Sequence, residues 1–183
     1  RPARLPADPG GGMSAPTTVF TGRAWVFGDR IDTDLLAPGH AIRKPIEELA
    51  KHCLEAVRPE FARDIVRGDV VVGGEGFGIG SSREQAAQAL RYLGVSVVVA
   101  KSAARIFYRN AFNLGLPVLI LPEAGQIADG ARLEVDLARG LVRDMTGGRE
   151  FRGEAVPDFL LEIVADGGLI PNLHKRLHGK PAA

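Results

Sequence analysis

Three short apolar runs, rich in β-branched residues, set the strongest limit on the fold of this chain. They cover residues 70–72, 95–100 and 117–121, and polar and apolar residues do not alternate within them. Continuous apolar runs of this length are typical of strands buried on both faces of a parallel sheet. Residues 82–93 and 103–114 separate them with a helical pattern, and a glycine follows each of these segments. The alternation predicts an α/β core.

The rest of the chain adds antiparallel strands and further helices to this core. Residues 133–137 and 141–145 flank a short turn and predict a β-hairpin. The remaining expected elements are a first strand at 17–27, a polar, turn-rich loop at 28–44, a short helix at 46–55 and a last helix at 157–165. We therefore expect a partly parallel central sheet with added antiparallel strands.

The domain organisation is simple. The length of 183 residues fits one domain, which we place at residues 13–178. Residues 1–12 are rich in proline and glycine and precede a methionine, so they are expected to be a disordered or non-native extension. Residues 179–183 are expected to form a flexible tail.

Composition excludes several classes of function. The formal charge of +1 gives no electrostatic footprint for a nucleic-acid partner. No apolar run reaches the length of a membrane span, and no signal-peptide segment is visible, so we expect a cytoplasmic protein without a membrane partner. Cys53 is the only cysteine, which rules out an intrachain disulfide and a cluster held by several thiolates of this chain. The histidines show no metal-ligand spacing, and we expect no metal site.

A glycine-rich turn before a helix is the clearest candidate for a binding site. Residues 74–84 read GEGFGIGSSRE, directly after the first buried strand run. The segment from Ser81 to Glu84 fits a capping box, with Ser81 as the N-cap. Capping explains neither the glycines nor Arg83, because a cation at a helix N-terminus opposes the macrodipole. Backbone N–H groups, serine hydroxyls and a guanidinium together favour an anion site.

The pattern favours a small anion over a nucleotide. A phosphate-binding P-loop needs a lysine that this turn lacks, and the spacing of a dinucleotide fingerprint fails in every register of residues 73–80. A carboxylate suits the triplet Ser81, Ser82 and Arg83 better. A nucleotide-binding enzyme is only weakly supported.

Three motifs in order give the chain a specific resemblance. They are GDRIDTD at 28–34, GEGFGIGSSREQA at 74–86, and AKSAARIFYRN at 100–110 followed by NLGLP at 113–117. Together they resemble the swivel domain of the aconitase superfamily. Length and motif order resemble the small subunits of the 3-isopropylmalate dehydratase and homoaconitase families. The implied fold is a swivelling β/β/α three-layer domain.

The resemblance implies a hydro-lyase that isomerises a hydroxy di- or tricarboxylic acid by dehydration and rehydration. The expected reaction converts 2-isopropylmalate to 3-isopropylmalate in leucine biosynthesis. Homoaconitate and methylmalate or dimethylmalate are alternative substrates, and a non-catalytic anion-binding module is an alternative of another class. In the family, a large subunit carries a four-iron–four-sulfur cluster, so we expect a cluster-bearing partner and no cofactor on this chain.

The resemblance also assigns roles to five residues. Ser81 corresponds to the base that removes the carbon-bound proton, and Arg83 to the group that stabilises its alkoxide and grips a substrate carboxylate. Ser82 helps to orient the substrate, and Asp34 orients Arg83, although Asp34 also suits a loop-stabilising turn. Arg43 lies in the recognition loop, where AIRK replaces the family's frequent YLRT. This departure leaves the choice between an apolar branch and a further carboxylate open.

Overall fold

The computed structural model describes residues 17–179, and the expected extension 1–12 and residues 180–183 of the expected tail lie outside them. Its strands are β1 (Val19–Val26), β2 (Val70–Gly73), β3 (Val97–Ala100), β4 (Val118–Ile120), β5 (Arg132–Asp136), β6 (Leu141–Asp144) and β7 (Arg149–Arg152). Its helices are α1 (Thr33–Leu36), α2 (Ile46–Leu49), α3 (Phe61–Asp64), α4 (Glu84–Tyr92), α5 (Arg105–Asn113), α6 (Asp158–Ala165) and α7 (Leu169–His178), with 3-10 turns η1 (Ala50–His52) and η2 (Ala124–Gln126).

A single mixed sheet with the strand order β4-β3-β2-β1-β5-β6-β7 forms the centre of the fold. β1, β2, β3 and β4 are parallel to one another. The pairs β1–β5, β5–β6 and β6–β7 are antiparallel. β1 joins the two halves, because its first residues pair with β5 while Ala24–Val26 pair with β2. The predicted parallel core and the predicted hairpin are both confirmed.

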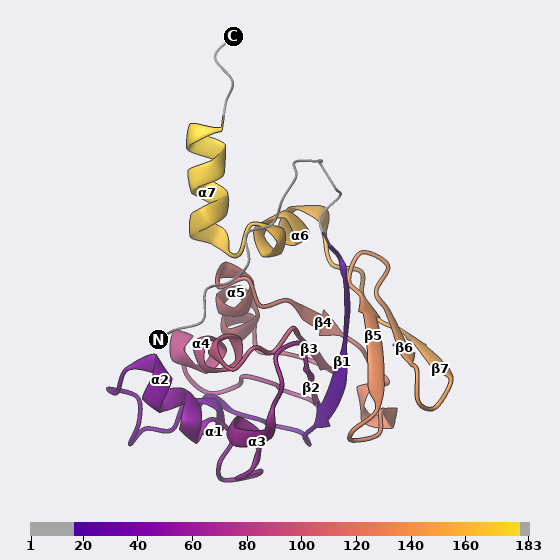
Figure 1. Cartoon of the computed structure of the whole chain (residues 1–183), viewed down its shortest axis with the longest axis horizontal. Coiled ribbons are helices and arrows are strands. Elements are labelled where there is room, and N and C mark those ends of the chain that lie inside the picture. The colour runs from indigo at the N-terminus through magenta and orange to yellow at the C-terminus, as the bar shows by residue number, and fades with distance from the viewer. Residues whose placement is uncertain (1–16, 180–183) are drawn as a thin grey trace, which may run out of the picture.

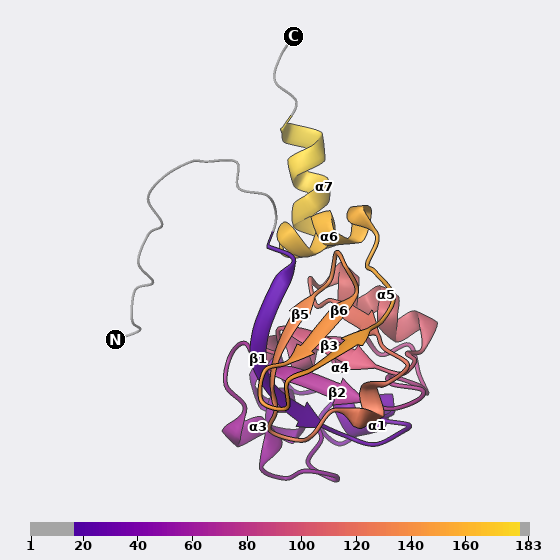
Figure 2. The same cartoon turned by 90° about the vertical axis from the view of Figure 1, so that its right-hand side faces the viewer.

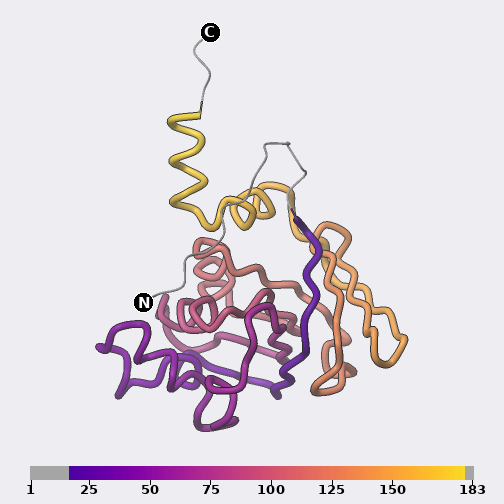
Figure 3. The backbone as a smooth tube through the Cα atoms, in the orientation of Figure 1, coloured from indigo at the N-terminus to yellow at the C-terminus, as the bar shows by residue number. Residues whose placement is uncertain are grey.

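The sheet curls, so that the parallel strands lie in the middle of three layers. In Figure 1, α4 and α5 lie on one side of these strands and β5 to β7 on the other, and Figure 2 shows β5 and β6 in front of β2 and β3. Every residue of β2 and β3 is buried, as strands covered on both faces must be. The tube in Figure 3 shows the chain between β1 and β2 folded beside the helices, away from β5–β7.

The structure corrects the expected start of the helix after the glycine turn. α4 begins at Glu84, with Arg83 as its N-cap and no side-chain capping bond, so the predicted capping box does not form. The hydroxyl of Ser81 instead contacts Thr33, 48 positions earlier. This long-range contact, at 2.9 Å, is shorter than the local hydrogen bond of 3.4 Å that Ser81 Oγ accepts from Arg83 N–H. Sequence periodicity does not reveal it.

Further elements were not predicted from the sequence. α1 lies inside the expected loop 28–44 and is capped by Asp32, whose carboxylate accepts a hydrogen bond of 2.8 Å from Leu35 N–H. β7 carries one apolar residue, Phe151, between charged neighbours, so it lacks a strand pattern. α7 lies beyond residues 157–165, which we expected to be the last helix, and most of its surface is exposed. None of the described helices is both long and apolar enough to cross a membrane.

Candidate active site

The glycine turn packs against its own chain at two points. A Cβ on Gly74 would lie 1.8 Å from Oδ1 of Asp29, and one on Gly78 would lie 2.2 Å from Cγ of Phe107. Gly76 and Gly78 also have φ of +67° and +75°, which L side chains rarely adopt. The glycines are therefore explained by contacts within the protein. The anion site that the sequence favoured at this turn stays a prediction.

The turn is joined to residues 29–34 by backbone hydrogen bonds. The N–H of Gly78 donates to the carbonyl of Ile31 at 2.7 Å, and the N–H of Thr33 donates to the carbonyl of Ile79 at 2.9 Å. These bonds bring the first and second sequence motifs together, although about 45 residues separate them. The two loops are hydrogen-bonded to each other beyond the carboxyl end of β2, where ligands of α/β sheets commonly bind.

Ser81 is held by a threonine that sequence reasoning had left without a role. The Oγ atoms of Ser81 and Thr33 lie 2.9 Å apart, and Ser81 N–H donates to Thr33 Oγ1 at 3.0 Å. Thr33 is only 2% exposed. Either hydroxyl can donate in the Thr33–Ser81 contact, and the Thr33 O–H can donate to Ser81 Oγ while its oxygen accepts the N–H. The N–H of Arg83 donates to the same Ser81 oxygen across a longer 3.4 Å.

Arg83 and Asp34 form an ion pair through Nη1 and Oδ1. The same nitrogen donates to the carbonyl of Ala37 at 3.4 Å. The guanidinium side chain is 29% exposed and the carboxylate 71% exposed, so the pair contributes only about 0–1 kcal/mol to stability. The structure thus brings together the two residues that were predicted to cooperate, and their chemical roles stay predictions.

Ser82 and Arg43 do not take part in the Arg83–Asp34 ion pair. Ser82 is exposed, and its carbonyl accepts a hydrogen bond of 3.3 Å from Asn110 Nδ2 of α5. Arg43 lies exposed in the turn before α2. Within residues 17–179, it makes no hydrogen bond or ion pair with the other predicted site residues. The structure therefore does not bring Arg43 into the cluster formed by Thr33, Asp34, Ser81 and Arg83.

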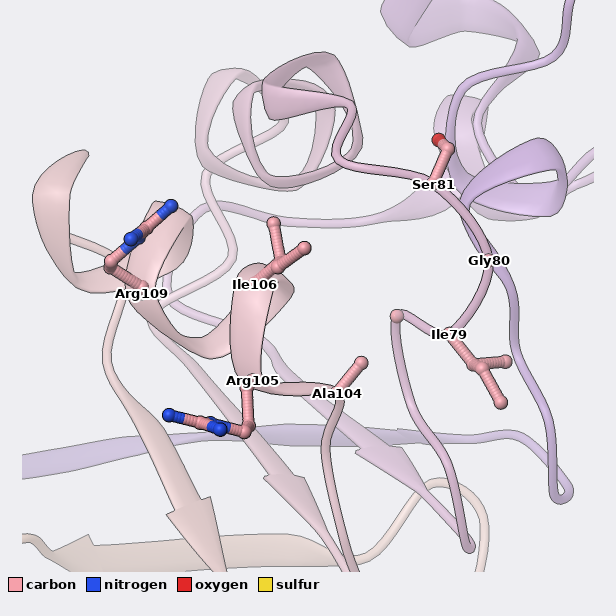
Figure 4. A pocket seen from close by; sticks show the side chains of 8 residues that line it. Ile79, Gly80, Ser81, Ala104, Arg105, Ile106 and Arg109 are labelled. Carbon is pink, nitrogen blue, oxygen red and sulfur yellow. The ribbon is translucent and has the colours of Figure 1, made fainter.

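A cleft of about 650 Å³ opens between the glycine turn and the start of α5. Figure 4 shows Ser81 and Ile79 on one side of it, with Arg105 and Arg109 projecting from α5 on the other. Both arginines are exposed. Of the five predicted site residues, only Ser81 lines this cleft. Arg105 is the first residue of α5, so the electrostatic argument applied to Arg83 would have singled it out as well.

The residues of this chain do not fit an iron–sulfur cluster. Such a cluster is held by several thiolates, and the chain has one cysteine, Cys53. Cys53 is fully buried, and burial raises the pKa of its thiol far above the usual range. A neutral, inaccessible thiol is a poor metal ligand.

Comparison with known proteins identifies the family. Residues 63–124, which hold the glycine turn and α4, match the model of the aconitase C-terminal domain. The chain is 50% identical over 163 residues to 3-isopropylmalate dehydratase small subunit 1 of Thermotoga maritima, covering 88% of this chain and 97% of that protein. The chain belongs to this family of dehydratase small subunits.

Two further relatives support this family assignment. The homoaconitase small subunit of Methanothermobacter thermautotrophicus is 45% identical over 160 residues, covering 87% of this chain and 93% of the relative. A crystal structure of the dehydratase (LeuD) from Methanocaldococcus jannaschii superposes with a TM-score of 0.82 at 42% identity, covering 87% and 95% of the two chains. The predicted three-layer fold and the predicted family resemblance are confirmed.

Proposed function

We propose that this chain is the small subunit of a hydro-lyase that isomerises 2-isopropylmalate to 3-isopropylmalate by dehydration and rehydration. The observation that carries the proposal is 50% identity to a dehydratase small subunit over 97% of that protein's length. The intact Ser81, Ser82 and Arg83 triplet supports a catalytic role over a purely anion-binding one. We expect the chain alone to fold and to show no turnover.

The proposed partner is a large subunit that carries the four-iron–four-sulfur cluster. When bound, such a cluster supplies a Lewis acid for the substrate hydroxyl. The single buried Cys53 supports this division of labour, because this chain lacks the ligands for such a cluster. Ser81, Ser82 and the cleft are exposed in the isolated chain, as a surface that a partner completes would be.

In this proposal, Ser81 moves the proton. Its Oγ accepts the proton from the substrate carbon, so it must enter the step as an alkoxide. A hydrogen bond from the Thr33 hydroxyl and one from the Arg83 N–H would stabilise that negative charge, at 2.9 and 3.4 Å. Thr33 is a positioning residue here, since it is buried behind Ser81.

Arg83 is proposed to bind a substrate carboxylate, with Ser82 beside it and Asp34 behind it. Its Nη1 is engaged with Asp34, which orients the guanidinium and leaves its other nitrogens for the substrate. The substrate carries two carboxylates, and Arg105 and Arg109 add positive charge to the neighbouring cleft.

A second candidate substrate is homoaconitate, and one observation favours it. Arg43 is exposed in a loop where the sequence departs from the family's frequent pattern, so it is available for a third carboxylate. The 45% identical homoaconitase small subunit shows that the family includes this type of protein. Methylmalate and dimethylmalate remain in the panel of substrates to be tested.

The test is turnover after anaerobic mixing with the cluster-loaded large subunit from the same source. We expect dehydration of 3-isopropylmalate and, in Arg83→Ala, a loss of kcat/KM of about 30- to 5,000-fold, the equivalent of breaking a desolvated charge pair. Arg139→Ala is the matched control, because Arg139 is exposed in the β5–β6 turn.

The outcomes separate the candidates. Turnover of homoaconitate alone, abolished by Arg43→Ala, would move the assignment to a homoaconitase. An assembled, cluster-loaded complex that turns over none of the hydroxy acids would refute the catalytic proposal and favour the anion-binding module.

A further inference from the structure

Two histidines and one carboxylate converge outside the candidate active site. His40 Nε2 lies 3.3 Å from Oε1 of Glu55, and His52 Nδ1 lies 2.7 Å from Oε2 of the same residue. The two imidazole rings meet edge to face, with their centroids 4.9 Å apart. One potential ligand atom from each of the three residues lies within 4.8 Å of the others. Our sequence analysis had found no metal-ligand spacing, because His40 is twelve positions from His52.

Separate segments of the fold bring these side chains together. His40 lies in the turn that follows α1, and His52 ends η1. Glu55 is held beside His52 by a turn in which its N–H donates to the His52 carbonyl at 3.2 Å. Between them, the buried Leu54 adopts φ of +61°, an unfavourable conformation for a leucine. Its N–H donates to the carbonyl of Leu35 at 2.8 Å, which anchors the whole turn to α1.

We infer that His40, His52 and Glu55 form a binding site for a divalent transition-metal ion of the Zn²⁺ type. Two imidazoles and one carboxylate are a ligand set that Zn²⁺ takes in proteins, with a fourth position left for water. Ligand atoms bound to one tetrahedral ion at about 2.1 Å lie about 3.4 Å apart. The His40–Glu55 distance of 3.3 Å matches this value, the His52–Glu55 distance of 2.7 Å is shorter, and the three ligand atoms all lie within 4.8 Å of one another, so side-chain rotations would complete the site.

The exposure and the charge of these three side chains also suit a bound cation. The side chains of His40, His52 and Glu55 are 56%, 28% and 37% exposed, so an ion can enter from solvent without opening the core. The carboxylate supplies the negative charge, and neutral imidazoles supply two lone pairs. Cys53, the neighbour of His52, points into the core and takes no part.

A bound ion would link two parts of the chain. It would tie the loop at residues 38–44, which carries Arg43, to η1. The site itself is argued from its own geometry, and it is independent of the proposed dehydratase reaction.

The test is Zn²⁺ titration of the full chain by calorimetry. The chain has four histidines, and the other two, His174 and His178, lie on one face of α7 with ring centroids 6.0 Å apart. Two histidines in this i, i+4 arrangement bind zinc elsewhere, so the titration is made in a His174→Ala/His178→Ala background. We expect one Zn²⁺ per chain, and visible absorption of four-coordinate Co²⁺ when cobalt replaces zinc.

Variants of the site then decide the inference. Adding His40→Ala or Glu55→Gln to that background should weaken Zn²⁺ binding at least about tenfold and remove the Co²⁺ absorption. Glu47→Gln, which removes an exposed carboxylate of α2, is the matched control and should change neither. Circular dichroism checks that each variant is folded. Absence of binding in the background protein, or binding that His40→Ala leaves unchanged, would overturn the inference and reduce the cluster to a hydrogen-bonded triad.

Discussion

At the scale of single residues, the contact between Thr33 and Ser81 has the most direct consequence for chemistry. Replacing Thr33 by valine keeps the volume and removes the hydroxyl that contacts Ser81 Oγ. A hydrogen bond to a charged group is worth about 1.5–3 kcal/mol, so kcat of the assembled enzyme should fall about 10- to 100-fold. KM should change little, because Thr33 is buried behind Ser81.

The serine variant distinguishes this role from a structural one. Thr33→Ser keeps the hydroxyl and should restore most of kcat, even though it loses a buried methyl group. Steady-state kinetics of both variants, with circular dichroism as a check on folding, make the comparison. Equal activity of wild type and Thr33→Val would remove Thr33 from the mechanism.

Cys53 gives a prediction about pH and stability. Burial raises the pKa of its thiol in the folded state, whereas the unfolded chain has an ordinary value near 9.0. Above that pH, the unfolded state loses the proton and the folded state keeps it, so the free energy of unfolding falls as pH rises. The loss is up to about 1.4 kcal/mol for each pH unit.

Urea denaturation at pH 8 and pH 10 measures this effect. The stability advantage of wild type over Cys53→Ala should shrink between the two values. Tyr108, whose pKa is also raised by burial, is present in both proteins and cancels in the difference. A thiol reagent should label Cys53 in urea and leave it unmodified in the native protein at neutral pH. A constant difference between the variants would show that the thiol titrates normally.

At the scale of elements, close contacts with neighbouring side chains explain why the glycine turn has glycine at positions such as 78. Gly78→Ala should destabilise the protein by more than its backbone conformation alone explains, because the new Cβ would lie 2.2 Å from Cγ of Phe107. Gly148→Ala is the matched control, since Gly148 has a similar φ of +69° and nothing within 4 Å of the added Cβ.

Both substitutions force alanine into a left-handed conformation, at a cost of about 1–2 kcal/mol. Gly78→Ala should lose about 1–3 kcal/mol more, the usual cost of overpacking. Urea denaturation of the two variants gives the difference directly. If the two losses are equal, Phe107 moves aside and the turn is looser than the structure indicates.

At the scale of the whole molecule, the fold divides into a three-layer body and a projecting C-terminal helix. Figure 1 shows α7 rising from α6 and pointing away from the sheet. Asn172 is its one buried residue, while Ile170 and Leu177 are 63% and 76% exposed. Its contacts with α6 include the surface ion pairs Lys175–Asp166 and Arg176–Glu162.

A chain that ends after Gly168 should therefore keep the fold. Two surface ion pairs contribute about 0–1 kcal/mol each, and the buried amide hydrogen bond about 1 kcal/mol, so we expect a loss of at most about 3 kcal/mol. Circular dichroism and urea denaturation test this. A truncated chain that fails to fold would show that α7 is part of the body of the protein.

The parallel core could be predicted from the sequence because its signals are local. Strands buried on both faces read as uninterrupted β-branched runs, and each helix between them is followed by a glycine, so residues 70–72 and 95–100 were placed nearly as they are. The order of β5 and β6 followed from their short turn. β7 was missed because one buried Phe151 among charged residues leaves no periodic pattern.

The triplet Ser81, Ser82 and Arg83, the single cysteine and the family resemblance could likewise be read from the sequence alone. Only the tertiary structure decided that Ser81 meets Thr33 and that His40 meets Glu55. The pairing of Arg83 with Asp34 was already implied by the family resemblance. The tertiary structure also showed that Gly74 packs against Asp29 and Gly78 against Phe107. The physical reason is that periodicity and capping patterns report neighbours within a few positions of the chain. Contacts between distant loops depend on how the sheet brings its strand ends together.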